Sequence, residues 1–117
     1  MAKVAMILRR APYGDINAAE AVRHALGGVA DGLGVQLILA DGGVLVAKKG
    51  QEAAGTGFTN LEQVLRDCID MGVEVFADRL SLKDQHIDPS DILEGVNVLT
   101  GAEIAAIIED AKTTMIF

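Results

Sequence analysis

The chain has 117 residues, half of them hydrophobic but only 3% aromatic, and a formal net charge of −7. This length fits one domain spanning residues 1–117. The acidic balance argues against direct nucleic-acid binding, which needs a basic surface. Charges interrupt the apolar runs, which are too short to span a membrane. The start at Met1 has no signal-peptide layout, and one cysteine cannot form an internal disulfide, so we expect a cytoplasmic protein.

Short apolar runs alternate with helical patterns along the chain. The runs that predict strands are Val4–Leu8, Val35–Ala40, Val73–Ala77, Val96–Leu99 and Thr113–Phe117. Apolar residues at helical spacing predict helices over Asn17–Leu33, Asn60–Met71 and the segment after Thr100. Val44–Lys48 fits a short helix or a strand extension, and Pro89 fits the first position of a short helical turn. Lys49–Phe58 and Asp78–His86 are predicted to be connections without regular structure.

Helix ends carry recognisable signals. A capping side chain followed three residues later by Glu occurs at Asn17 and Glu20, at Thr59 and Glu62, and at Thr100 and Glu103. Glycines suited to ending a helical segment are Gly32, Gly34, Gly72 and Gly95.

Strands alternating with helices imply an α/β fold whose mainly parallel sheet is covered on both faces. Ligands of such sheets gather at the carboxyl ends of the strands. Three segments are expected there: Arg9–Asp15, Asp41–Gly43 and Asp78–Lys83. The candidate ligand- or partner-binding residues are Pro12, Tyr13, Gly14, Asp41, Gly42, Asp78, Arg79 and Ser81.

Cys68 lies on the apolar stripe of a predicted helix, together with Leu61 and Leu65. A buried thiol behaves as a small hydrophobic group with a raised pKa, whereas a reactive thiolate needs exposure and a positive neighbour. Asp67 and Asp70 add negative charge nearby. We therefore interpret Cys68 as a packing residue.

Other familiar sites are not supported by the residue pattern. His24 and His86 are far apart and do not form a metal-ligand set, so we expect no metal and no cofactor. The loop around Gly55 and Gly57 matches neither a phosphate-binding loop nor a dinucleotide fingerprint. Ser81 has no evident base in the sequence, which disfavours a nucleophilic serine.

The order of several short motifs resembles the DsrE/DsrF-like family, particularly its YchN-like branch. These motifs are Ala11-Pro12-Tyr13-Gly14, Gly50-Gln51, Gly55-Thr56-Gly57-Phe58, Leu61-Glu62-Gln63-Val64-Leu65, Leu93-Glu94-Gly95-Val96 and Met115-Ile116-Phe117. The resemblance covers essentially the whole chain and implies a three-layer α/β/α sandwich with a five-stranded, mainly parallel sheet. It also implies a trimer or hexamer that works in intracellular sulfur relay, where a cysteine just beyond the third strand carries a persulfide and passes it to a partner protein.

The chain departs from that family pattern where the carrier cysteine is expected. The corresponding segment is Ala77–Ser81, and Asp78 and Ser81 are the best-matched occupants of the cysteine positions. Neither a carboxylate nor a hydroxyl can hold a persulfide, and Cys68 is about ten residues earlier. The resemblance therefore transfers no catalytic role to any residue.

Three hypotheses remain open at this stage. The preferred one is a homo-oligomeric relative of sulfur-relay proteins without its own carrier cysteine, which acts as a scaffold or binds a small ligand or a sulfur-carrier partner. The alternative is an active sulfurtransferase that carries persulfide on Cys68, so whether the chain is an enzyme stays undecided. A flavodoxin-like cofactor-binding protein ranks last because a phosphate-binding first loop is missing. The terminal strand Thr113–Phe117 and the many small apolar residues also favour an oligomer, because terminal strands often need cover that subunit packing can provide.

Overall fold

A computed structural model describes residues 3–13, 16–51 and 60–117. Its strands are β1 (Lys3–Leu8), β2 (Gly34–Leu39), β3 (Glu74–Asp78), β4 (Val96–Leu99) and β5 (Thr113–Ile116). Its α-helices are α1 (Asn17–Ala30), α2 (Leu61–Asp70), α3 (Arg79–Asp84) and α4 (Gly101–Asp110). Two 3-10 helices, η1 (Asp41–Ala47) and η2 (Pro89–Asp91), complete the described elements.

The strands form one parallel sheet in the order β4-β3-β2-β1-β5. The register pairs Met6 of β1 with Leu37 of β2 on one side and with Met115 of β5 on the other. β2 is buried along nearly its whole length, as its unbroken apolar run predicts. The predicted α/β fold, five-stranded parallel sheet and strand positions are therefore confirmed.

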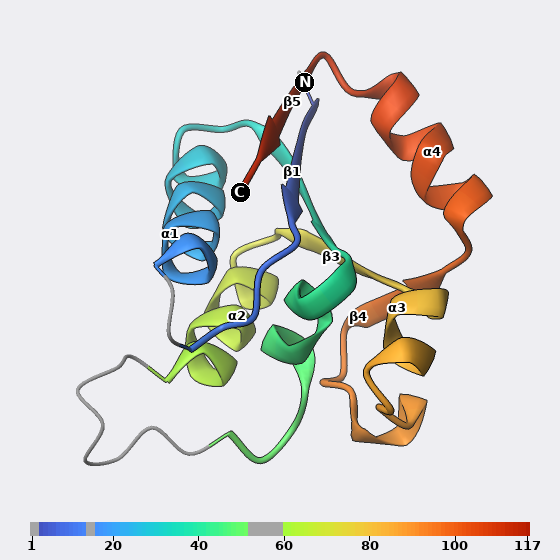
Figure 1. Ribbon diagram of the computed structural model, residues 1–117. Coiled ribbons are helices and arrows are strands. Elements are labelled where there is room, and N and C mark those ends of the chain that lie inside the picture. Colours follow the sequence, from blue (N-terminus) through green and yellow to red (C-terminus); the bar gives the residue numbers. More distant parts are fainter. Residues whose placement is uncertain (1–2, 14–15, 52–59) are drawn as a thin grey trace.

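The two faces of the sheet are covered unequally (Figure 1). α1 and α2 lie side by side on one face and enclose the large apolar core, which includes Leu8, Leu37 and Leu65. α4 lies on the opposite face over a small buried cluster of Ala5, Ile38 and Phe76. None of the residues of α4 is fully buried. The result is a three-layer arrangement with one thick and one thin helical layer.

Helix caps differ in part from the sequence expectation. Thr100 and Glu103 form the predicted reciprocal capping box at α4. The box expected at Asn17 is wrong: α1 begins after Ile16, which provides no side-chain cap, and the Glu20 carboxylate instead accepts from Arg23 at 2.6 Å. Asn60 caps α2 by accepting from the backbone N–H of Gln63, while the predicted cap Thr59 lies outside the described residues.

The segment expected to be an irregular connection after β3 contains the helix α3 instead. Asp78 caps this helix, because its carboxylate accepts from the backbone N–H of Ser81 at 3.1 Å. Leu82 is 2% exposed, whereas Leu80 is 65% exposed, so α3 packs through one apolar side chain. Six residues with one buried leucine show too little periodicity to predict a helix.

The 3-10 helix η1 packs directly on the carboxyl end of β1. A Cβ atom added at Gly43 would lie 2.1 Å from the carbonyl oxygen of Leu8, so no side chain fits there. Asp41, the first residue of η1, has φ +50°, a conformation that non-glycine residues seldom adopt. This close approach brings the chain after β2 against the chain after β1.

Gln36 is a buried polar residue in the middle of the sheet. It is 5% exposed, points to the same face as Ile38, and is paired in register with Ala5 and Glu74. Its side-chain Oε1 accepts no hydrogen bond from the part of the chain that the structure describes. An unsatisfied buried acceptor destabilises a fold by about 1–3 kcal/mol.

We therefore expect Gln36→Met to raise the free energy of unfolding by about 1 kcal/mol, because methionine fills similar space without an unsatisfied oxygen. Urea unfolding with a fixed m-value measures this change. Gln63→Met, at an exposed position of α2, is the control and should alter stability by less than about 0.5 kcal/mol. A lower stability of Gln36→Met would show that the amide is satisfied in solution.

Candidate functional site

The three segments predicted to meet at the carboxyl edge of the sheet are linked by a chain of hydrogen bonds. The Arg9 Nε donates to the Asp41 carboxylate at 3.0 Å. The backbone N–H of Asp41 donates to the Ser81 Oγ at 2.8 Å. The Ser81 hydroxyl in turn donates to the Asp78 carboxylate at 2.6 Å. The ends of β1, β2 and β3 are thus joined through the side chains of Arg9, Asp41, Ser81 and Asp78 and the backbone N–H of Asp41.

Ser81 is the buried centre of this chain of contacts. Ser81 is 4% exposed. Its hydroxyl donates to the Asp78 carboxylate and accepts from the backbone N–H of Asp41. The expectation that Ser81 lacks a basic neighbour is wrong, because the Asp78 carboxylate accepts a hydrogen bond from the Ser81 hydroxyl. The same Asp78 oxygen also accepts from the Ser81 N–H and caps α3. The pair is therefore arranged as a structural turn, and the hydroxyl is shielded from solvent rather than presented to a substrate.

The outer part of the chain of contacts is open to solvent. The side chains of Arg9 and Asp41 are 64% and 60% exposed, so their ion pair contributes little to stability. Gly42 also packs closely, because a Cβ there would lie 3.2 Å from the backbone nitrogen of Ala11. A ligand reaching this edge would meet the Arg9–Asp41 pair before it met Ser81.

The remaining predicted site residues do not all join this group. Pro12 is buried and Tyr13 half-buried, and both lie in a second group with Gln51. Arg79 is exposed and lines a separate hollow of about 420 Å³ beside Leu82. Gly14 lies outside the described residues. The predicted site is thus divided into neighbouring parts.

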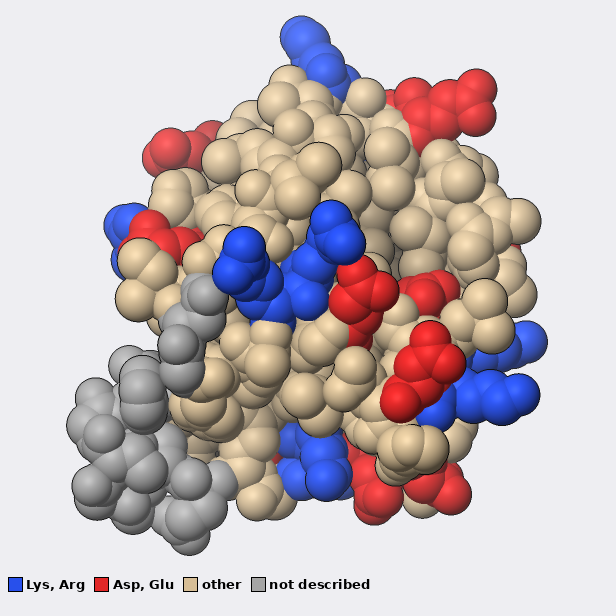
Figure 2. Space-filling view, in the orientation of Figure 1, with Lys and Arg blue, Asp and Glu red and all other residues tan. Residues whose placement is uncertain are grey.

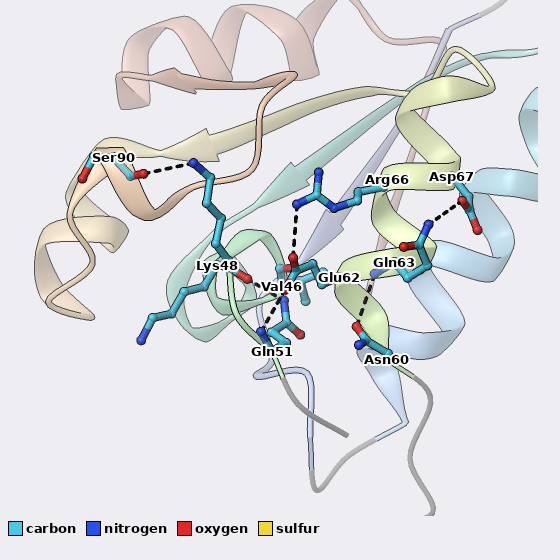
Figure 3. Close-up of polar contacts among 10 residues, drawn as sticks. Val46, Lys48, Gln51, Asn60, Glu62, Gln63, Arg66, Asp67 and Ser90 are labelled. Atoms are coloured by element: carbon cyan, nitrogen blue, oxygen red, sulfur yellow. Dashed lines mark hydrogen bonds and ion pairs between the residues drawn. The ribbon is translucent and has the colours of Figure 1, made fainter. Parts of the chain in front are cut away.

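Gln51 organises the second group (Figure 3). Its side-chain nitrogen donates to the carbonyl oxygens of Val46 at 2.7 Å and Lys48 at 2.9 Å. Its side-chain oxygen accepts from the Tyr13 hydroxyl at 2.9 Å. Its backbone N–H donates to the Glu62 carboxylate at 2.8 Å, so Gln51 connects the chain after β1, the end of η1 and the start of α2.

Glu62 completes that group from α2. It accepts from the Gln51 N–H and from the Arg66 guanidinium at 3.2 Å. The hydrogen bond from Gln51, assisted by Arg66, lowers the pKa of the Glu62 carboxyl below its ordinary value. Sequence analysis quoted Gln51 only as part of a family motif. Its partners are up to 38 residues away, so no local pattern could have assigned it a role.

Cys68 is a core residue, as its helical position predicts. It is 0% exposed, and its Sγ lies 3.6 Å from the carbonyl oxygen of Val22 on α1. Burial, with a smaller contribution from the charge of Asp67, raises the pKa of the thiol to about 11. At neutral pH only about one molecule in ten thousand carries the thiolate at that pKa.

A further hollow lies where the strand order reverses between β1 and β5. It measures about 500 Å³ and is lined by Arg9, Arg10, Asn17, Ile116 and Phe117. Crevices at this kind of topological switch point are frequent ligand sites in open α/β sheets. It adjoins the chain of contacts through Arg9.

The two histidines occupy separate environments. The His24 Nδ1 lies 2.7 Å from the carbonyl oxygen of Glu20, and its ring centroid is 5.4 Å from that of Phe117. His86 is exposed, with φ +57°. Over residues 3–13, 16–51 and 60–117, no three His, Cys, Asp or Glu side chains are grouped so that they could hold a metal ion.

Charges on the surface are mixed rather than segregated. Figure 2 shows basic side chains near the centre of one face with acidic side chains directly beside them. Within the described residues, none of the helices has both the length and the apolar character needed to cross a bilayer. This face therefore offers no broad basic surface of the kind that nucleic acids require.

Comparisons with known proteins agree with this architecture. The E. coli YchN protein has a solved structure that superposes with a TM-score of 0.91 at 24% identity, with both chains fully covered. The uncharacterised protein MK0008 of Methanopyrus kandleri is 29% identical over 97% of this chain and 93% of its own. The intracellular sulfur oxidation protein DsrF of Allochromatium vinosum is 34% identical over 87 residues, which are 74% of this chain and 64% of its own. The model of the DsrE/DsrF-like family matches residues 2–117, and the chain belongs to that family.

Proposed function

We propose that this protein takes part in intracellular sulfur relay as an oligomeric subunit without a persulfide-carrying cysteine of its own. Membership of the DsrE/DsrF-like family and the similarity to a sulfur oxidation protein support the connection with sulfur metabolism. On this proposal, the protein acts in the cytoplasm as a scaffold, or binds a small ligand or a sulfur-carrier partner at the carboxyl edge of its sheet.

One observation carries the proposal: the end of β3 is occupied by the Asp78–Ser81 pair. The hydroxyl of Ser81 is buried, donates to the Asp78 carboxylate and accepts from the backbone N–H of Asp41. One carboxylate oxygen of Asp78 also caps α3. Oxygen nucleophiles cannot form the S–S bond of a persulfide. What remains for this edge is recognition, through Arg9, Asp41 and the adjoining hollow of about 500 Å³.

The alternative function is sulfur transfer on Cys68. This thiol would have to leave the contact between α1 and α2, where its residue is fully buried and its pKa is raised to about 11. A persulfide carrier instead needs an accessible sulfur with appreciable thiolate character. The alternative therefore requires helix α2 to open before each transfer.

Assembly into a homo-oligomer, as a trimer or hexamer, is the second part of the proposal. The β4 and β5 strands are the edges of the sheet, and Ile116 of β5 is 69% exposed. The thin layer formed by α4 leaves Ile104, Ile107 and Ile108 only half-buried. Packing of a second subunit would cover this apolar side.

A persulfide-loading experiment separates the two functions. After incubation with a small-molecule persulfide, the wild-type protein should keep its mass, because its thiol is buried and protonated. A double variant, Asp78→Cys with Cys68→Ala, should gain one sulfur atom, because position 78 is only half-buried at the carboxyl edge. Intact mass spectrometry gives both results.

Cys68→Ala alone is the control for that experiment and should also stay unmodified. A stoichiometric sulfur adduct on the wild-type protein, passed to a partner and lost in Cys68→Ser, would overturn the proposed function in favour of the alternative.

The raised pKa of Cys68 predicts a specific pH dependence of stability. Below its ordinary value of 9.0 the thiol is protonated in both states. Between pH 9.0 and about 11 the unfolded chain loses the proton while the folded chain keeps it, so stability falls as pH rises. The fall attributable to this group is roughly 2–3 kcal/mol. Urea unfolding of wild type and Cys68→Ala across this range should show the extra fall only in the wild type; parallel curves would contradict a buried thiol.

Light scattering at micromolar concentration should give the mass of an oligomer. Ile116→Lys should reduce that mass, because it places a charge on the apolar edge of β5. Met71→Lys, at an exposed position after α2, is the matched control and should leave assembly intact. A monomeric wild-type protein would remove this part of the proposal.

A further inference from the structure

A small hollow of about 310 Å³ lies beside the Gln51 group and is separate from the Asp78–Ser81 pair. It is lined by Ala11, Pro12, Tyr13, Leu45, Lys48 and Gln51. Two parts of the chain build it: the segment after β1 and the end of η1 with the residues that follow. Its volume is at the lower end of the range for ligand sites, which limits an occupant to a few carbon atoms and one polar group.

The walls of this hollow are held in place before any ligand arrives. Gln51 makes four hydrogen bonds, to Tyr13, Val46, Lys48 and Glu62. The Tyr13 oxygen also accepts from the backbone N–H of Leu61, at 3.4 Å. A preformed site loses less conformational entropy on binding than one that must be ordered.

These same contacts decide the chemistry that the hollow offers. Both side-chain N–H groups of Gln51 are used by carbonyl oxygens, and its side-chain oxygen accepts from Tyr13. The amide therefore has no donor left for a ligand. Pro12, Leu45 and the ring of Tyr13 contribute apolar surface, so the interior favours a hydrocarbon group.

Lys48 supplies the one cationic group of this lining. It is exposed, and the structure gives its ammonium group no hydrogen bond or ion pair with the described residues. The neighbouring carboxylate of Glu62 is instead engaged by Gln51 and Arg66. The ammonium group of Lys49, next in the chain, donates to the carbonyl oxygen of Ser90 at 3.3 Å. The charge of Lys48 is thus available to a ligand, whereas Lys49 is committed elsewhere.

We propose that this hollow binds small molecules that combine a short apolar group with a single negative charge, the apolar group against Pro12, Leu45 and Tyr13 and the anion at Lys48. Because the chain has a net charge of −7, the protein as a whole does not attract anions. Binding of an anion in this hollow therefore depends on the local charge of Lys48. The site goes beyond the proposed function, because its binding chemistry involves no sulfur transfer.

Hexanoate is a suitable probe, with hexanamide and acetate as comparison ligands. In a titration followed by amide NMR, hexanoate should shift the signals of Ala11, Tyr13 and Gln51, with a dissociation constant on the order of 1 mM. Hexanamide lacks the charge and acetate lacks the apolar group, so both should bind at least about threefold more weakly. Affinity for hexanoate should also fall as salt rises.

Two variants test the roles of the lining residues. Lys48→Gln should weaken hexanoate binding about threefold, while the matched variant Lys49→Gln should leave it unchanged. Ala11→Asp places a carboxylate at the exposed rim without touching the core and should abolish measurable binding.

Three results would overturn the proposal: no localised shifts with hexanoate at millimolar concentration, equal affinity for hexanamide, or equal weakening by Lys48→Gln and Lys49→Gln. Persulfide loading and light scattering are independent of this titration. Failure of the hollow to bind hexanoate would therefore leave the proposed function standing. Failure of the persulfide-loading or light-scattering prediction would likewise leave this binding proposal standing.

Discussion

The buried hydroxyl of Ser81 joins the chain segments at the carboxyl edge of the sheet. It lies between the backbone of Asp41, which follows β2, and the carboxylate of Asp78, which ends β3. The same carboxylate starts α3. Losing that hydroxyl would leave the part-buried N–H of Asp41 without this partner, a cost of about 1–3 kcal/mol, while the Asp78 oxygen would keep the hydrogen bond from the Ser81 N–H. The central polar groups of this edge satisfy one another's hydrogen bonds, and this limits the chemistry available there.

Close backbone packing makes this arrangement rigid. Gly43 lies against the carbonyl of Leu8 with no room for a side chain, and Gly42 approaches the backbone of Ala11. Asp41, immediately before them, takes a positive φ value. Such a conformation persists only where the surroundings fix it, here through the hydrogen bond to Ser81 and the close packing of Gly43. The backbone at this edge is therefore closely packed and held by hydrogen bonds.

Much of the fold was predictable because buried strands and helices show regular patterns of apolar residues in the sequence. The apolar run around Leu37 and Ile38 gave β2, and helical spacing placed Cys68 in the core. α3 was missed, because a six-residue helix with Leu82 as its buried leucine has no clear period. The cap predicted at Asn17 failed because Ile16 is the N-cap residue and Asn17 is already the first residue of α1, a shift of one position that the spacing alone does not reveal.

The candidate site was predictable only in outline. Parallel strands end at one edge, so Asp41 and Asp78 were expected together and are found together. The division of Tyr13 from them was not foreseeable, since it depends on Gln51, 38 residues further along the chain. Side-chain hydrogen bonds between distant segments follow from the packed fold and have no periodic signature.

The position of the one thiol completes the argument about function. Cys68 lies between α1 and α2, on the face of the sheet with the thick helical layer, and its environment favours the protonated form. Exposing it would open the main apolar core, to which Leu61 and Leu65 of the same helix belong. Burying each such leucine contributes about 1.5–3 kcal/mol, so opening would consume much of the 5–15 kcal/mol by which small domains are stable. A carrier must expose its sulfur in every cycle, whereas exposing the Cys68 sulfur would disrupt the main apolar core of this fold.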